Sequence, residues 1–288
     1  MKVLVLGGDG MLGHELYLAL RGRHETRVTL RQPLSAYAAN GLFDSTNTFA
    51  DVDVRARGRL EEVVSQFRPQ AVVNCIGIVK QRPESEDAIV SIEVNSLMPH
   101  RLALACRAAG ARVVHLSTDC VFSGDRGRYS ETDRPDPVDI YGRSKLMGEI
   151  TGDGALTLRT SMIGRGLYRK TSLVDWLVAQ KGRVQGYRKA VFSGLTTREL
   201  SRVIGLVIEK HPQASGLYHL SAEPIDKCAL LTKLRARLGL SIDIEPVDEP
   251  RIDRSLDSTR FRRVFGYAPP SWDAMLDELA QDILGKAA

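Results

Sequence analysis

Tyr141 and Lys145 place a phenol and an ammonium four residues apart, which puts both side chains on one face of a helix. An unperturbed tyrosine has a pKa of ~10 and is a poor acid–base group at neutral pH. A neighbouring cation favours the phenolate and brings that pKa toward the working range. Such a pair can give a proton to a carbonyl oxygen while a nicotinamide delivers hydride to the carbon. The spacing therefore indicates carbonyl reduction, although it also occurs by chance on surface helices.

Thr118 strengthens this interpretation because it ends the apolar segment Arg112–Ser117, which is typical of a buried strand. Ligands bind at the carboxyl ends of parallel strands in open α/β sheets. We therefore expect Thr118 to hydrogen-bond a substrate oxygen beside Tyr141. Lys145 would in addition hold the ribose of the nicotinamide, so Thr118, Tyr141 and Lys145 form the expected catalytic set.

Gly7, Gly10 and Gly13 form a GxxGxxG loop between a predicted strand and a predicted helix. Glycines there permit a tight turn and let a pyrophosphate approach the N–H groups of the helix N-terminus. An acidic residue usually follows the second strand and binds the ribose 2′-hydroxyl. Here that position holds Arg31, which suits the 2′-phosphate of NADP(H). NADP(H) is thus favoured as cofactor, NAD(H) stays the alternative, and a solvated loop arginine is the competing interpretation.

Short β-branched runs alternate with helical segments through the first half of the chain, which predicts an α/β fold. We expect a Rossmann-type doubly wound parallel sheet over residues 1–160, with later elements returning to it, and a smaller, mainly substrate-binding lobe over 161–288. The expected strands are Lys2–Leu6, Thr26–Leu30, Ala71–Cys75, Arg112–Ser117, Leu156–Arg159 and Leu217–Leu220. The expected helices are Met11–Arg21, Arg59–Gln66, Ile89–Ala109, Tyr141–Glu149, Leu173–Gln180, Arg198–Lys210, Asp226–Leu238 and Trp272–Leu284.

The composition of the 288 residues is that of an ordinary globular protein, with 43% hydrophobic and 26% charged residues. The net charge of +5 is scattered, which disfavours a nucleic-acid arm and suits phosphorylated ligands. No apolar run reaches the ~18 residues of a membrane span, and MKVLVLGG is no signal peptide. The four cysteines lack CxxC spacing and nearby histidine pairs, so we expect no metal site and a cytoplasmic protein.

These motifs together resemble the extended short-chain dehydrogenase/reductase family, and within it the dTDP-4-dehydrorhamnose reductase branch. The resemblance is strongest over HLSTDCVFSGDRGRYSETDRPDPVDIYGRSKLMGE (His115–Glu149) and extends loosely over the rest of the chain. It implies a reductase of a nucleotide-linked 4-keto-(deoxy)sugar in surface polysaccharide or deoxysugar biosynthesis. The substrate would be a nucleotide-diphosphate sugar, and a homodimer is a further expectation because family relatives include dimers.

The resemblance also implies roles for single residues, on the cofactor side and on the substrate side. Asn95 would support the active site. The other cofactor-binding residues would be Met11 and Leu12 at the diphosphate, Asp53 and Val54 beside adenine, and Cys75, Ile76, Gly77 and Ser117 under the cofactor. Substrate would meet Lys80, Thr118, Asp119, Val121, Phe122, Tyr141, Met162 and Thr196. One or two cations would clamp its diphosphate, from among Arg165, Arg169, Arg188, Lys189, Arg251 and Arg254.

Two other functions stay open at this point. A nucleotide-sugar epimerase or dehydratase would use a tightly bound NAD on the same fold, and a regulatory subunit would be non-catalytic. Arg31 disfavours the first, and an intact Thr118, Tyr141 and Lys145 disfavours the second. The segment Gly77–Gln81 departs from the Ala-Tyr-Thr run of the branch, so sugar and nucleotide stay undetermined.

Overall fold

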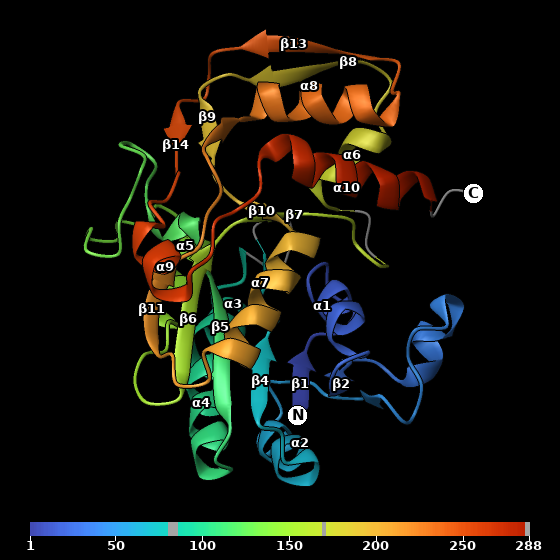
Figure 1. Ribbon diagram of the computed structural model, residues 1–288, viewed down its shortest axis with the longest axis vertical. Coiled ribbons are helices and arrows are strands. Elements are labelled where there is room, and N and C mark those ends of the chain that lie inside the picture. The colour runs from blue at the N-terminus through green and yellow to red at the C-terminus, as the bar shows by residue number, and fades with distance from the viewer. Residues whose placement is uncertain (80–85, 169–170, 286–288) are drawn as a thin grey trace.

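The computed structural model describes residues 1–79, 86–168 and 171–285. Its centre is a seven-stranded parallel sheet in the order β11-β6-β5-β4-β1-β2-β3 (Figure 1). The strand order reverses between β1 and β4, as in doubly wound folds. The predicted fold class is therefore confirmed. The strands are β1 Lys2–Leu6, β2 Glu25–Thr29, β3 Thr48–Phe49, β4 Ala71–Asn74, β5 Arg112–Thr118, β6 Ala155–Thr160 and β11 Gly216–His219.

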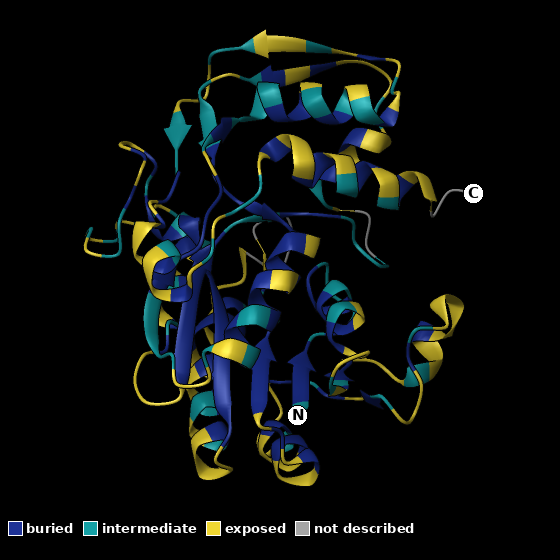
Figure 2. Cartoon of the chain, viewed as in Figure 1, coloured by how far each residue is buried: buried dark blue, intermediate teal, exposed yellow. Residues whose placement is uncertain are grey.

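Helices cover both faces of this sheet, so the residues of its central strands are buried (Figure 2). Val3 and Val5 of β1 join the apolar cluster that contains α1 (Gly13–Leu20) and α7 (Thr197–Lys210). Leu4 and Leu6 join the opposite cluster, under α2 (Arg59–Phe67) and α4 (Met98–Ala108). The carboxyl ends of the strands are left uncovered by this arrangement and face the C-terminal elements (Figure 1).

The prediction of a single long helix over Ile89–Ala109 is wrong. The chain forms α3 (Ala88–Ser91), a π-helical turn η3 (Ile92–Leu97) and then α4. Pro99 explains the interruption, because it has no N–H to donate to the carbonyl one turn earlier. That carbonyl belongs to Asn95, which the widened turn places against α5 (Ile140–Met147).

After β6 the chain builds smaller elements at the carboxyl end of the sheet and returns to the sheet twice. Helix α7 packs against α1, and β11 pairs with β6 at the sheet edge. Three small sheets, β12-β9-β14, β13-β8 and β10-β7, stand apart from the large one. The remaining bounds are η1 Leu34–Asn40, η4 Asp119–Val121, β7 Met162–Ile163, α6 Leu173–Val178, β8 Gly182–Tyr187, β9 Ala190–Phe192, β10 Leu195–Thr196, β12 Ile225–Asp226, α8 Lys227–Leu238, β13 Ile242–Val247, β14 Ile252–Asp253, α9 Thr259–Phe265 and α10 Trp272–Gly285.

In the described part of the chain, no helix combines the length and the apolar character that crossing a bilayer requires.

Candidate active site

The glycine loop connects β1 to α1 in a turn that side chains would block. Gly7 has a φ of +77°, and the Gly10 N–H donates to its carbonyl at 3.0 Å. A Cβ on Gly13 would lie 2.0 Å from the same carbonyl oxygen, so only glycine lets α1 begin this close to the strand. The first N–H groups of a helix have no partner within it. The loop therefore has the form of a diphosphate cradle.

A second feature of this loop escaped the sequence analysis. A Cβ on Gly8 would lie 2.6 Å from Cβ of Val28, so Gly8 is required where the loop crosses β2. Thr29 fixes the crossing, because its hydroxyl accepts from the Gly7 N–H at 3.1 Å. Its carbonyl accepts from the Gly8 N–H at 3.0 Å.

Beyond the glycine loop, Arg31 is exposed after β2 and is electrostatically coupled to Asp53. The Asp53 carboxylate accepts from the Arg55 guanidinium, with a shortest distance of 2.6 Å, which holds its pKa below the ordinary value. Val54, next to it, is buried. Arg31 is thus an exposed cation just after β2, while Asp53 already has a partner in Arg55.

The segment after β4 lies against α5 through one amide side chain, that of Asn95. Its Oδ1 accepts from the Ile78 N–H at 2.8 Å, and its Nδ2 donates to the Ile78 carbonyl at 3.0 Å. The same Nδ2 donates to Ser144 Oγ at 3.1 Å. Gly77 keeps the approach open, since a Cβ there would lie 3.3 Å from Asn95 Oδ1 and 3.9 Å from Lys145 Nζ. Asn95 thus ties the loop Cys75–Ile78 to the helix that carries Tyr141 and Lys145.

Helix α5 sits between two backbone segments without room for side chains. A Cβ on Gly142 would lie 2.2 Å from the Cys120 carbonyl oxygen, and one on Gly148 would lie 1.8 Å from that of Asn95. Asp139 caps the helix by accepting from the Gly142 N–H at 2.8 Å. This close fit brings the Tyr141 hydroxyl beside Thr118 at the end of β5.

Lys145 is buried behind Tyr141, with 4% of its surface exposed. Its Nζ donates to the Leu116 carbonyl at 2.6 Å, which anchors the ammonium on β5. Burial lowers its pKa to about 8, and the Glu149 carboxylate opposes this shift. The expected catalytic set of Thr118, Tyr141 and Lys145 is therefore gathered in one place by the fold.

The pKa of Tyr141 corrects one expectation. Burial raises it above its ordinary value of 10, and the Cys120 thiol and the Asp119 carboxyl add to that rise. In the protein alone, the phenol is therefore held protonated at neutral pH rather than driven toward phenolate. A protonated phenol suits a group that must donate a proton to a keto oxygen.

Asp119 faces two cations that come from far along the chain. Burial raises the pKa of its carboxyl, and the charges of Arg254 and Lys227 oppose that rise. Arg254 is fixed by donating from Nε to the Phe122 carbonyl at 2.8 Å. The Lys227 ammonium lies 4.3 Å from the centre of the Phe192 ring. Lys227 begins α8, and no motif in the sequence connects it with the site.

Several of the expected contacts are not supported by the side-chain positions, which is a second correction. Val121 and Phe122 have no exposed surface and belong to an apolar cluster with Tyr129 and Leu256. The Thr196 side chain is buried and accepts from the Glu199 N–H at the start of α7. Ser117 Oγ donates to Glu149 at 2.6 Å, and Leu12 is 4% exposed, so backbone atoms alone of these two residues can contact a cofactor. Met162, Met11, Cys75 and Ile76 are partly exposed.

The candidate phosphate-clamping cations mostly have carboxylate partners. Arg165 pairs with Asp175, Arg188 and Lys189 pair with Asp248, and Arg251 pairs with Glu249. Lys80 and Arg169 lie outside the described residues. Arg254, together with the unexpected Lys227, instead acts on Asp119, the neighbour of Thr118.

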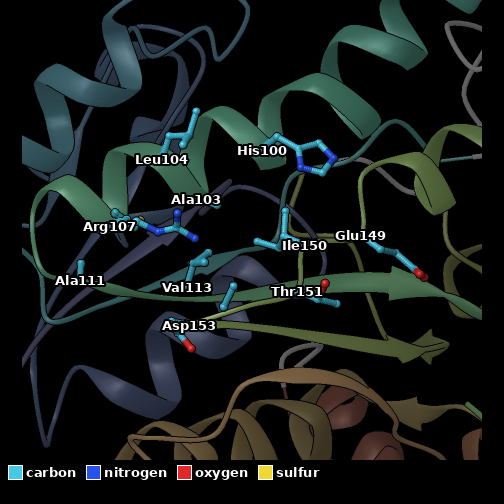
Figure 3. A pocket seen from close by; sticks show the side chains of 13 residues that line it. His100, Ala103, Leu104, Arg107, Ala111, Val113, Glu149, Ile150, Thr151 and Asp153 are labelled. Atoms are coloured by element: carbon cyan, nitrogen blue, oxygen red, sulfur yellow. The ribbon is translucent and has the colours of Figure 1, made fainter.

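A cavity of about 340 Å³ lies elsewhere, between α4 and the segment that enters β6 (Figure 3). His100, Leu104, Arg107, Ile150 and Asp153 are among its lining residues. None of Thr118, Tyr141 and Lys145 contributes to it, so this cavity is separate from the candidate active site. Among the residues that the structure describes, no three His, Cys, Asp or Glu side chains gather as ligands of a metal ion would.

Comparison with known protein families matches residues 1–284 with the RmlD substrate binding domain. The chain belongs to this family. The resemblance inferred from the motifs is thereby confirmed.

Relatives of the RmlD family agree with this assignment. The dTDP-4-dehydrorhamnose reductase of Escherichia coli (strain K12) is 27% identical over 310 residues, covering 97% of this chain and 98% of that protein. The dTDP-4-keto-6-deoxy-D-glucose reductase of Streptomyces niveus is 32% identical over 169 residues, covering 56% of this chain and 53% of its own length. The dTDP-4-dehydrorhamnose reductase from Bacillus anthracis str. Ames, solved in complex with NADP, has a TM-score of 0.80 at 21% identity and covers 98% of this chain and 99% of that one.

The depressed pKa of Lys145 predicts that Lys145→Met stabilises the protein at pH 7. The change from an ordinary 10.5 to about 8 corresponds to a penalty on the order of 3 kcal/mol, from which the lost hydrogen bond to Leu116 subtracts about 1. Since the folded-state pKa is the lower one, the penalty is full below pH 8 and fades as the pH rises toward 10.5. The gain of about 2 kcal/mol should therefore shrink between pH 8 and pH 10.

Urea unfolding at pH 7, 8, 9 and 10 measures this gain. Lys181→Met, at an exposed position, is the matched control and should leave the free energy of unfolding nearly unchanged. A methionine variant less stable than the unmodified protein at pH 7 would contradict the assignment of a strained buried ammonium.

Proposed function

We propose that this protein is an NADP(H)-dependent reductase of a nucleotide-linked 4-keto-(deoxy)sugar, in deoxysugar or surface polysaccharide biosynthesis. The observation that carries the proposal is the Tyr141 hydroxyl beside Thr118 at the carboxyl edge of the sheet, with the Lys145 ammonium buried one helical turn away. Reductases of this substrate class from Escherichia coli and Streptomyces niveus support it. An oxidoreductase acting on a nucleotide sugar accounts for both findings.

The residues present fit a dinucleotide at the carboxyl ends of the strands that the first half of the chain forms. The cradle of Gly7, Gly10 and Gly13 suits a diphosphate, with N–H groups of Met11 and Leu12 as donors. Arg31 suits a 2′-phosphate, and the fold relative from Bacillus anthracis was solved with NADP. The cofactor, when bound, supplies hydride.

The protein's own part in the reaction is to orient the keto oxygen and deliver a proton to it. Thr118 and Tyr141 interact with each other, so a keto oxygen bound beside them would accept hydrogen bonds from both hydroxyls. Tyr141, held protonated by burial, gives its proton as charge develops on that oxygen. The Lys145 ammonium stabilises the resulting phenolate and binds the ribose of the cofactor.

We place the nucleotide diphosphate on the side of α8, β9 and β14. Lys227 and Arg254 reach the site from this side and face Asp119. In this proposal residues 1–160 mainly bind the cofactor, and residues 161–288 mainly bind the substrate.

An epimerase or dehydratase with bound NAD is the second candidate, because such enzymes share the fold. The UDP-glucose 4-epimerase of Thermotoga maritima has a TM-score of 0.79 at 17% identity. Arg31, in place of an acidic residue, disfavours tightly held NAD. A non-catalytic regulatory subunit is the third candidate, and the complete catalytic set argues against it.

The direct test follows NADPH absorbance while the protein meets a panel of dTDP-, UDP-, GDP- and CDP-linked 4-keto-sugars, generated in place by dehydratases. We expect NADPH oxidation with one nucleotide series and slower turnover with NADH. NAD that copurifies without net consumption would favour the epimerase. NADPH binding with no turnover until a partner enzyme is added would favour the regulatory subunit.

Tyr141→Phe is expected to lower kcat by ~10²–10⁴-fold, because it removes the proton donor and leaves the ring in place. NADPH binding, followed by fluorescence, should persist. Tyr187→Phe is the matched control, since the Tyr187 hydroxyl meets Gln185 at 3.4 Å away from the site. Near-normal turnover of Tyr141→Phe would rule out this mechanism.

We also propose a cytoplasmic homodimer. All four cysteines are free thiols, as is usual in a reducing compartment. Exposed apolar side chains gather on the surface of α3, η3, α4 and α5, where His100 Nε2 and the Met147 carbonyl are 2.8 Å apart. The exposed side chains are Ile89, Ile92, Leu97, Leu104, Ile140 and Met147. Apolar surface of this kind is commonly covered by a partner, here a second copy of the chain.

Light scattering after size exclusion should give twice the mass of one chain. The double variant Leu104→Glu with Met147→Glu is expected to give a monomer, because it places charges on the apolar surface. Leu284→Glu, at another exposed leucine, should remain dimeric. A monomeric unmodified protein would refute the dimer and leave the reductase proposal untouched.

A further inference from the structure

A buried ion pair lies just after the C-terminal end of α5. It includes none of the three expected catalytic residues. Arg159 of β6 donates to the Glu149 carboxylate through Nε at 2.7 Å and Nη2 at 2.8 Å. Ser117 Oγ donates to the same carboxylate at 2.6 Å. The side chains of Arg159 and Glu149 are 4% and 10% exposed. Because desolvation offsets most of the attraction in a buried pair, stability alone is a weak reason for such an arrangement.

The cation of this pair is held from its other side as well. Arg159 Nη1 and His219 Nε2 are 3.3 Å apart, and His219 Nδ1 lies 2.9 Å from the Tyr129 carbonyl. The guanidinium also lies 5.3 Å from the centre of the Phe122 ring. With Arg159 fixed in this way, the Glu149 carboxylate has one position.

That position is coupled to Lys145 through the neighbouring strand. Glu149 lies just after the C-terminal end of α5, four residues beyond Lys145, and its carboxylate acts electrostatically on the ammonium. Ser117, which holds the carboxylate, is the neighbour in β5 of Leu116, whose carbonyl holds the ammonium. Adjacent residues of one strand thus fix the two opposite charges.

The other titratable groups that face Lys145 are neutral at pH 7. Burial raises the pKa of the Cys75 thiol, after β4, to about 12. Burial also lowers the pKa of His115, in β5, well below its ordinary value, and His100 of α4 faces His115. Among the described residues, Glu149 is therefore the charged group that acts on the ammonium. Figure 3 shows its side chain extending away from the other residues that line the cavity beside α4.

We infer that Glu149, clamped by Arg159 and Ser117, is a positioning residue for Lys145. It fixes the last turn of α5 against the sheet and sets a negative charge that keeps the buried lysine protonated. Its significance for catalysis rests on the proposed function, whereas its effect on the lysine does not.

The test follows lysine Cε signals by ¹³C NMR across pH in the protein itself, with Lys145 assigned from a Lys145→Met variant. Lys145 should titrate near 8, as expected from its pKa of about 8. In Glu149→Gln the midpoint should move to lower pH by about one pH unit. Glu199→Gln is the matched control, since Glu199 is equally buried and pairs with Arg202 on α7. In Glu199→Gln the titration midpoint of Lys145 should be the same as in the unmodified protein.

An unchanged midpoint in Glu149→Gln would overturn the inference. Should that variant fail to fold because Arg159 is left unpaired, Glu149→Gln with Arg159→Met removes both charges and relieves that cost. A smaller downward movement is expected in the double variant, because the loss of the Arg159 cation favours protonation of Lys145, and an upward movement would overturn the inference.

If the panel of keto-sugars identifies a substrate, kcat/KM should vary with pH as the protonation of Lys145 does. Glu149→Gln should lose about five-fold at pH 8 and little at pH 6, as a midpoint lower by about one unit requires. An equal loss at every pH would mean a structural role. Because the NMR titration needs no substrate, a silent panel with a moved midpoint would refute the reductase and leave the positioning role in place.

Discussion

A lysine ammonium buried against a backbone carbonyl is the interaction around which this site is built. Lys145 can stay inside only because its Nζ reaches the Leu116 carbonyl and because the Glu149 carboxylate counters its desolvation. Both require α5 to be held beside β5. Gly142 and Gly148 let α5 approach the backbone of Cys120 and of Asn95, since any side chain at either position would collide with those carbonyl oxygens.

The same close approach explains why a π-helical turn stands opposite α5. Pro99 frees the Asn95 carbonyl from the helix ladder, and Gly148 approaches that oxygen. The Asn95 side chain then connects the loop after β4 with Ser144. The π-helical turn and the glycines thus set the distance between the neighbouring backbone and α5, the helix that carries Tyr141 and Lys145.

Local patterns were enough to predict the glycine loop and six of the seven strands of the large sheet, all but the two-residue β3, and Thr118, Tyr141 and Lys145 do lie together. Lys2–Leu6 is a strand with the predicted bounds, because five apolar or β-compatible residues lead directly into Gly7. Long-range contacts could not be predicted in this way. Val121 and Phe122 are buried because Tyr129 and Leu256 cover them, and Lys227 reaches Asp119 from more than 100 positions along the chain. Strands of two or three residues, such as β9, are too short to show a period.

Strand β11 has a consequence for how the two halves could be exchanged between enzymes. It lies at the edge of the large sheet, although the chain enters it from the elements around β9 and β10 and leaves it for α8. His219 at its end reaches Arg159, so the edge strand is joined to the support beneath the active site. A chimera cut once, after residue 160, would import a foreign edge strand together with the new substrate-binding elements. A transplant that keeps the native edge strand needs two further junctions, one on either side of α7 and β11.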